Sequence, residues 1–171
     1  MKKFMTTYVA ILMLLFPLSS TAQTIDSLII YRQALKYISK DLGIKKKRIA
    51  VSNKIQDLDC FMYIDSVKGS NIQMILRKRQ ERSINPNANR DNIYSFILDK
   101  RFNKISNHTE YTLFFSYIED GIVLAEIGKL QKNGKSTEYW TVANTALQFF
   151  NYMFIYDSKN ILKQCVRVKM E

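Results

Sequence analysis

Residues 111–130 read YTLFFSYIEDGIVLAEIGKL, and this stretch decides the fold. Two runs rich in strand-favouring residues, 111–118 and 122–130, flank the dipeptide Asp120-Gly121. Asp-Gly between two apolar runs is a strong signal for a tight hairpin turn. The stretch therefore predicts two adjacent antiparallel strands.

The same pattern continues toward the end of the sequence. Asn133-Gly134 is a second hairpin signal and precedes an expected strand at 136–142. Runs 149–157 and 161–170 form a third expected hairpin around residues 158–160. The last third of the chain is thus expected to be an antiparallel meander.

One amphipathic helix is predicted upstream, over residues 24–42. Its apolar stripe recurs every three or four positions, and Gly43 stands where a helix commonly ends. The stripe consists of Leu28, Tyr31, Leu35, Ile38 and Leu42. A helix followed by a meander indicates an α+β fold with the helix packed on the sheet. This order is similar to the cystatin-like and NTF2-like layouts, in which a curved sheet wraps a helix.

The middle of the chain gives weaker signals. Short strands are predicted at 49–52 and 58–64, and a helix at 71–82. Residues 85–92 are rich in Asn and predict a loop, while residues 92–105 fit a helix or a strand equally well.

The first 22 residues resemble a bacterial signal peptide. Lys2 and Lys3 precede an apolar run at 9–18, and small residues follow at 19–22. We expect cleavage before Gln23, export to the periplasm or beyond, and a single domain over 23–171. No later run is long and apolar enough for a transmembrane span.

The charge balance favours an acidic partner. The chain carries 26 Lys plus Arg against 15 Asp plus Glu, a formal charge of +11. Loss of Lys2 and Lys3 would remove two of these charges and leave +9. Acidic envelope glycans or lipid headgroups fit this charge, whereas nucleic acid is not expected for an exported protein. Basic residues cluster at Lys45–Arg48 and in a second group, in which Arg77, Lys78 and Arg82 are the candidate contacts beside Arg79.

Few residues suit catalysis. The single histidine, His108, lies in a polar stretch, and the nucleophile motif Gly-x-Ser-x-Gly and the redox motif Cys-x-x-Cys are absent from the sequence. We expect no cofactor and no metal. Glu126 is the exception, because it alternates with Ile122 and Leu124 and would share their apolar face. If that face is the core, Glu126 is a buried acid that has a raised pKa or a cationic partner. If the face is only partly covered, Glu126 pairs with a surface lysine.

The strand at 149–157 is apolar on both faces. Phe150, Tyr152, Phe154 and Tyr156 share one face, and Phe149, Met153 and Ile155 share the other. One face should meet the helix, and the other needs the middle segment, a second chain or an apolar ligand as its cover. Tyr152, Phe154 and Tyr156 are therefore candidate ligand contacts.

Cys60 and Cys165 form an even pair, as expected where an oxidising compartment allows a disulfide. Cys60 alternates with apolar residues and Cys165 with basic ones, which sets the two on different kinds of strand face. The sequence leaves the disulfide open. Without it, Cys165 would be a thiol among cations with the thiolate favoured.

Taken together, these features predict an exported, non-catalytic binding or interaction module of the bacterial cell envelope. Two alternatives remain open. One is a small enzyme with a pocket around Glu126. The other is a subunit that self-associates through its second sheet face.

Overall fold

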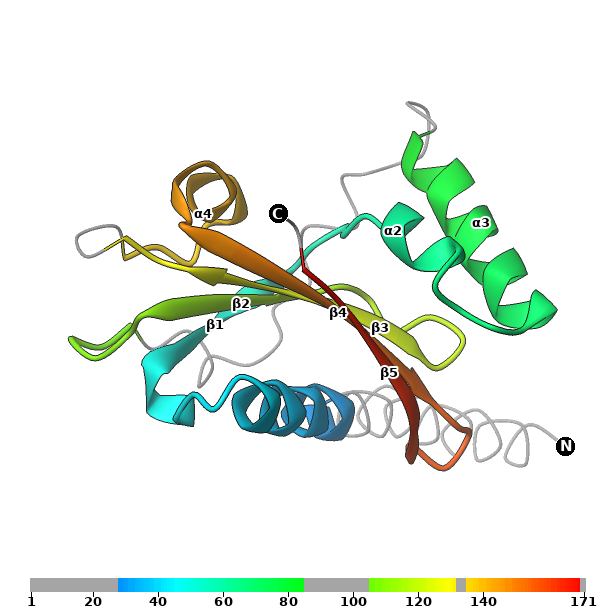
Figure 1. Ribbon diagram of the computed structural model, residues 1–171, viewed down its shortest axis with the longest axis horizontal. Helices are drawn as coiled ribbons and strands as arrows, with labels where there is room; N and C mark the ends of the chain where they lie inside the picture. The colour runs from blue at the N-terminus through cyan, green and yellow to red at the C-terminus, as the bar shows by residue number, and fades with distance from the viewer. Residues whose placement is uncertain (1–27, 85–104, 132–134, 170–171) are drawn as a thin grey trace, which may run out of the picture.

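The computed structural model describes residues 28–84, 105–131 and 135–169, and within them five strands form one sheet in chain order (Figure 1). Neighbouring strands from β2 to β5 pair antiparallel, whereas β1 lies parallel to β2 at the sheet edge. The sheet is mixed, so the expected meander is correct for β2–β5 only. The strands are β1 (Ile49–Ile55), β2 (Tyr111–Phe115), β3 (Ile122–Lys129), β4 (Gln148–Tyr156) and β5 (Leu162–Lys169).

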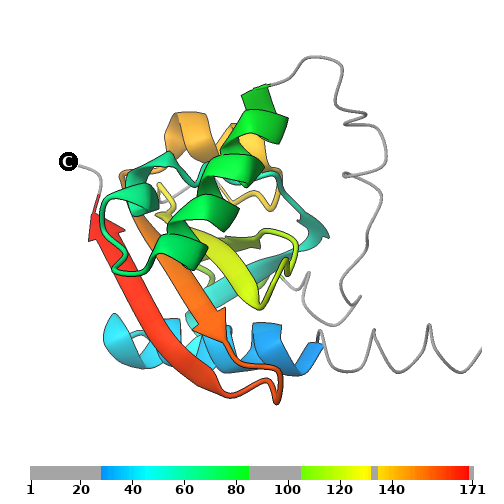
Figure 2. The same ribbon diagram turned by 90° about the vertical axis from the view of Figure 1, so that its right-hand side faces the viewer.

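Helices lie on both faces of this sheet, which confirms the α+β class. Residues 28–41 form a helix on one face, called here the first face. Three further helices cover the opposite, second face (Figure 2). They are α2 (Phe61–Ile64), α3 (Ser70–Ile84) and α4 (Tyr139–Thr145), and a single 3-10 turn, η1 (Lys46–Arg48), precedes β1.

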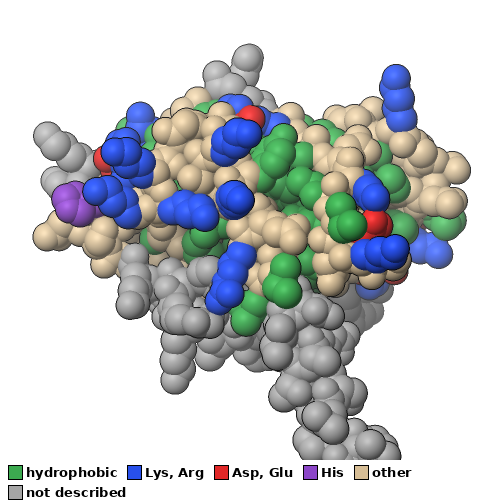
Figure 3. Space-filling model, turned by 90° about the horizontal axis from the view of Figure 1, so that it is seen from below, with side chains coloured by type: hydrophobic (Ala, Val, Ile, Leu, Met, Phe, Trp, Pro, Cys, Tyr) green, Lys and Arg blue, Asp and Glu red, His purple; other side chains and the backbone are tan. Residues whose placement is uncertain are grey.

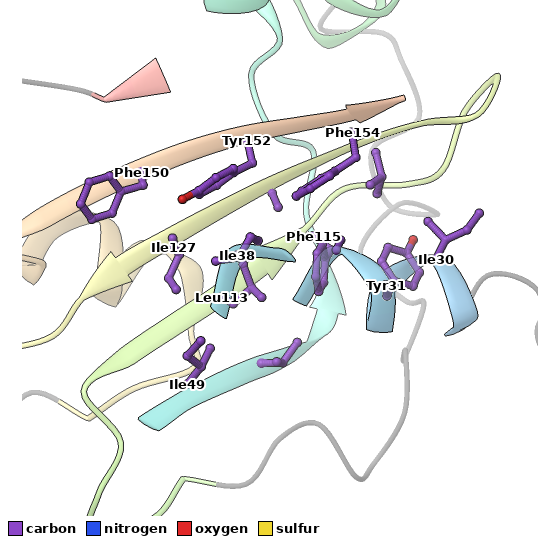
Figure 4. Packing of buried hydrophobic residues seen from close by; sticks show 14 of the residues in the cluster. Ile30, Tyr31, Ile38, Ile49, Leu113, Phe115, Ile127, Phe150, Tyr152 and Phe154 are labelled. Atoms are coloured by element: carbon purple, nitrogen blue, oxygen red, sulfur yellow. The ribbon is translucent and has the colours of Figure 1, made fainter. Parts of the chain in front are cut away.

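The core on the first face is built from aromatic and branched side chains (Figure 4). From the helix, Ile30, Tyr31, Ala34 and Ile38 are buried against the sheet. The buried stripe is therefore centred near Ala34, one residue before Leu35, the centre of the predicted stripe. Leu35 and Leu42, which the stripe included, are only partly buried.

The helix ends where the sequence indicates, at Gly43. Gly43 has φ +65°, a left-handed conformation that glycine adopts without strain. The Gly43 N–H donates to the Lys40 carbonyl at 3.2 Å, and the Ile44 N–H donates to the Ser39 carbonyl at 2.9 Å. This pair of bonds is a Schellman motif, and the Ile44 side chain that follows it is buried in the first-face core.

The β2–β3 turn also matches its prediction. Asp120 and Gly121 both have positive φ, +48° and +73°, as a two-residue type I′ turn requires. A Cβ on Gly121 would lie 2.5 Å from the Tyr156 carbonyl oxygen, so the turn packs directly against β4. The signal at Asn133-Gly134 lies outside the described residues.

The core on the second face is formed by the middle segment. Leu58, Tyr63 and Val67 from the α2 region and Leu76 from α3 pack against the sheet there. Met153 and Ile155 of β4 belong to the same cluster. Of the three covers considered for this face, the middle segment is the one observed. The bare sheet face on which self-association depended is therefore absent from the described part of the chain.

Two predicted strands, 58–64 and 136–142, are wrong. In the first, the Asp59 carboxylate accepts the Phe61 N–H at 2.8 Å, and this bond begins α2. The second becomes α4 because Gly128 of β3 leaves room for it. A Cβ on Gly128 would lie 2.8 Å from a Val142 methyl carbon. The contact with the sheet overrides the strand preference of residues 136–142.

Candidate functional site

The residues singled out in the sequence lie in three separate places. Glu126 of β3 is on the second face. Tyr152 and Phe154 of β4 point into the core of the first face (Figure 4), and Tyr156 belongs to the same buried cluster. Arg77, Lys78 and Arg82 belong to α3. The structure does not bring these three sets together into one site.

Glu126 is a buried acid with one hydrogen-bond partner. Tyr139 of α4 donates its hydroxyl to Glu126 Oε2 at 3.0 Å. Burial raises the pKa of Glu126 to about 7; the Tyr139 hydrogen bond opposes this rise and the charge of Asp59 adds to it. Near neutral pH this carboxyl is therefore close to half protonated, so it is able to give or take a proton.

Asn151 lies directly opposite Glu126 in the β3–β4 ladder. Side chains at such opposed positions share a face, with Cβ atoms about 5 Å apart. Asn151 is 0% exposed, and neither its amide nitrogen nor its amide oxygen has a hydrogen-bond partner among the described residues. Glu126, Asn151 and Tyr139 are called the polar cluster below.

The acid and the amide of the polar cluster are closed from solvent, and Tyr139 beside them is partly exposed. The Tyr139 ring packs edge-on against Phe114 with ring centroids 5.2 Å apart, and both Glu126 and Asn151 are buried. An open groove of about 610 Å³ lies elsewhere, between α3 and the β2–β3 turn. A substrate that entered this groove would not reach Glu126.

The groove has a mixed lining. Lys78 and Arg82 contribute two cations, and Glu81, Glu119 and Asp120 contribute three carboxylates. Arg82 forms an ion pair with Glu119. These charges do not favour an anion, which weakens the case for Lys78 and Arg82 as acidic-partner contacts.

The neighbouring Arg79 is a residue that the sequence reasoning grouped with exposed cations. It is 6% exposed, and its Nη1 has no hydrogen-bond partner among the described residues. Burial lowers its pKa, while Cys60, Glu119 and Asp57 oppose that shift. Its helical spacing could have revealed this, because position 79 lies three residues after Leu76 on the buried side of α3.

The aromatic candidates on β4 have structural partners. Tyr152 donates its hydroxyl to Asp41 Oδ2 at 2.7 Å, and Tyr156 donates to the Ile30 carbonyl at 3.3 Å. Phe154 stacks on Tyr152 with centroids 5.9 Å apart and meets Tyr37 edge-on at 5.5 Å. These contacts fasten the helix to the sheet and leave the three side chains engaged in the core.

The two cysteines are free thiols on opposite faces of the sheet. Cys60 packs into the core of the second face and Cys165 against that of the first. The disulfide that the sequence left open is not formed, because the sheet separates the two sulfur atoms. The expected Cys165 thiolate is also wrong, since burial raises the pKa of Cys165 to about 11 against a hydrogen bond with Tyr37 that lowers it.

The densest positive charge lies on a surface made by residues 32–47, called here the basic surface. Arg32, Lys36 and Lys40 are exposed and follow one another at four-residue intervals along the helix, so they form a row. Lys45, Lys46 and Lys47 are also exposed and extend the row toward β1. Figure 3 views the molecule from this side and shows many basic side chains with few acidic ones between them.

The acidic residue inside this segment does not neutralise the row. Asp41 accepts hydrogen bonds from Arg167 at 2.9 Å and from Tyr152 at 2.7 Å. Its carboxylate is therefore committed to β4 and β5. The basic surface keeps its positive potential for an external partner.

Comparison with models of protein families, with curated proteins and with solved structures finds no match for this chain. Within the described residues, the structure contains no helix of the length and apolarity needed to cross a bilayer.

Proposed function

We propose that the protein is an exported, non-catalytic binding module of the bacterial cell envelope and that its partner is acidic. One observation carries this proposal. Six exposed cations follow one another between residues 32 and 47, and the acid among them is bonded within the fold. Such a one-signed surface raises the local concentration of anions and speeds their encounter.

The proposed contact differs from the one that the sequence favoured. Arg77 is exposed on α3, but Lys78 and Arg82 share their groove with three carboxylates. Within residues 32–47 the acidic residue is Asp41, and its carboxylate is bonded to Tyr152 and Arg167. We therefore place the contact on the helix and the residues that follow it.

Export and the layout of the fold belong to the same proposal. The basic n-region, apolar run and small residues before Gln23 support cleavage there, which intact-mass measurement of exported protein would test. The helix seated on one face of the sheet supports a relation to the cystatin-like or NTF2-like layouts. The helices on the second face are an addition to that layout.

An enzyme centred on Glu126 is the second candidate, and the polar cluster favours it. A carboxyl with a pKa of about 7 beside an unpartnered Asn151 has the properties of a general acid or base. The enzyme ranks below the binding module because Glu126 is buried and the groove does not reach it. A substrate analogue that shifts the fluorescence of Trp140, which adjoins Tyr139 with ring centroids 5.3 Å apart, would promote the enzyme above the binding module.

The binding module is tested by retention on a column of immobilised heparin, which is a polyanion without a lipid phase. The variant Lys36→Glu with Lys40→Glu reverses two charges of the basic surface. Lys68→Glu with Arg77→Glu is the matched control, because both residues are exposed, Lys68 in the connection between α2 and α3 and Arg77 on α3, on the side of the second face.

We expect the unmodified protein to be retained and to elute earlier as salt rises, because salt screens charges beyond about 10 Å at 0.1 M. The first variant should elute markedly earlier than the control variant. Equal elution of the two variants would contradict the basic surface as the contact.

A further inference from the structure

Exposed apolar side chains lie beside the basic row on the same helix. Ile29 is 42% exposed and Tyr37 is 39% exposed. At about 100° per residue, these two and the row of Arg32, Lys36 and Lys40 fall within one outward arc of about 140°. The opposite arc holds the buried Ile38 and its neighbours. Tyr37, at the edge of the outward arc, also meets Phe154 edge-on at 5.5 Å and so contributes to the core.

A second apolar side chain comes from a different element. Ile161 is 52% exposed at the β4–β5 turn. This hairpin lies beside the start of the helix, as Figures 1 and 2 show from two directions. The Tyr156 hydroxyl, which donates to the Ile30 carbonyl at 3.3 Å, holds the two together. Lys159 and Lys163 flank the turn, and Lys163 pairs with Asp157 at 2.9 Å.

We propose that this face of the molecule docks onto the surface of an anionic lipid bilayer. The proposal rests on the proposed function and names the class of its acidic partner. Lys36, Lys40 and Lys45–Lys47 would meet lipid phosphates, and each basic residue near such a surface strengthens binding roughly fivefold. Ile29 and Ile161 would enter the boundary between headgroups and acyl chains.

The mixture of side chains distinguishes a bilayer from a soluble polyanion. An acidic glycan or polyphosphate pairs with lysines and gains nothing from an exposed isoleucine. A bilayer offers phosphates and, a few ångströms deeper, apolar volume for Ile29 and Ile161.

The helix docks as it stands. Its inner side stays packed on β4 through Ile30, Tyr31 and Ile38, so binding requires no unfolding. The contact is interfacial and reversible, because a few exposed side chains enter the headgroup layer and no segment crosses it.

The experiment is cosedimentation of the mature-length protein with phosphatidylcholine vesicles that contain or lack phosphatidylglycerol. We expect binding to the anionic vesicles only, weakened by salt. Lys36→Glu with Lys40→Glu should reduce it by at least roughly tenfold, given the contribution of each basic residue. Lys68→Glu with Arg77→Glu should leave it largely unchanged.

A second pair of variants tests the apolar contribution. Ile29→Ser with Ile161→Ser should weaken vesicle binding several-fold and leave retention on heparin unchanged. Met74→Ser with Leu147→Ser is the matched control, because both side chains are exposed in or beside the helices of the second face. Thermal unfolding of each variant confirms that it is folded.

Three results would contradict the bilayer proposal, and one of them would also contradict the proposed function. Vesicle binding that ignores Ile29→Ser with Ile161→Ser overturns the bilayer proposal. Retention on heparin without vesicle binding overturns it too, and leaves the proposed function standing with a soluble polyanion as partner. Absence of binding to both overturns the bilayer proposal and the proposed function together.

Discussion

On the first face of the sheet, one helix closes the core, and three buried tyrosine hydroxyls each have a partner. Tyr31 donates to the Ser116 carbonyl at 3.0 Å, and Tyr152 and Tyr156 donate to Asp41 and to Ile30. On the second face, three short helices cover a core in which the Asn151 amide and Arg79 Nη1 have no partner among the described residues.

The two faces therefore contribute differently: one mainly stabilises the fold, and the other holds the groups that could take part in chemistry. Satisfied polar groups in a packed core stabilise it, whereas buried polar groups without partners each cost free energy. The first face therefore holds the fold together. The second face carries Glu126, which changes its charge near neutral pH, and the buried polar atoms of Asn151 and Arg79 that have no partner among the described residues.

The largest effect is expected from the first face. Ile38→Ala should lower the free energy of unfolding by about 2–5 kcal/mol, because Ile38 is fully buried and the vacated space cannot collapse completely. Leu35→Ala is the control, since Leu35 is only partly buried, and should cost clearly less. Urea unfolding measures both. Equal losses would mean that the predicted stripe, centred on Leu35, describes the helix better than the observed one.

The next effect is the pH dependence that Glu126 imposes on the second face. Its folded pKa of about 7 lies above the ordinary 4.5. The protonated form is thus favoured by the fold: its stabilising contribution is complete below about pH 4.5 and is lost as pH rises through about 7. The difference between the two pKa values corresponds to about 3 kcal/mol.

Glu126→Gln removes this loss and keeps an acceptor for Tyr139. The variant should be more stable than the unmodified protein by up to about 3 kcal/mol at pH 8, and the two should converge near pH 4. Urea unfolding followed by the fluorescence of Trp140, the single tryptophan, measures the difference. A gap that is the same at both pH values would show that Glu126 ionises as an exposed glutamate does.

A smaller gain is expected from Arg79→Met. Arg79 is a buried cation whose Nη1 has no hydrogen-bond partner among the described residues, and replacing a buried charged group by an apolar side chain of similar volume should stabilise the fold by about 1–2 kcal/mol. Arg77→Met, at the exposed neighbouring position, should change stability by less than about 0.5 kcal/mol. A loss of stability in Arg79→Met larger than in Arg77→Met would show that the Arg79 guanidinium is paired in solution.

The smallest effect is expected at Asn151. Asn151→Leu replaces an unpartnered amide by an apolar side chain of similar shape and should raise the free energy of unfolding by about 1 kcal/mol. Gln33→Leu makes a comparable change at an exposed helix position and should have little effect. If Asn151→Leu destabilises the protein instead, the amide has a solution partner, such as a buried water.

The two faces also differ in how well the sequence predicts them. The helix on the first face, its stop at Gly43 and the Asp120-Gly121 turn are predicted by local signals and are observed, although the buried stripe of the helix differs from the predicted one. On the second face, the signals conflict with tertiary contacts. Residues 136–142 favour a strand by composition. Val142 instead packs against Gly128, where a side chain would clash, and residues 139–145 form a helix there.

This error at α4 also limited what could be predicted of the candidate site. Alternation with Ile122 and Leu124 correctly indicates that Glu126 is buried. Its partner Tyr139 reaches it only because residues 139–145 form a helix. The parallel pairing of β1 with β2 was equally beyond the sequence, because a long connection separates the two strands.

The hydrogen bonds of the three tyrosines on the first face join residues 85, 111 and 126 positions apart in the chain. The hairpins β2–β3 and β4–β5, by contrast, close within a few residues. Because ordering a long intervening chain is slow, the meander should form first and the helix should dock late, although the helix is synthesised earliest. Substitutions in the helix should then change the unfolding rate more than the folding rate, so this docking governs how long a folded molecule survives.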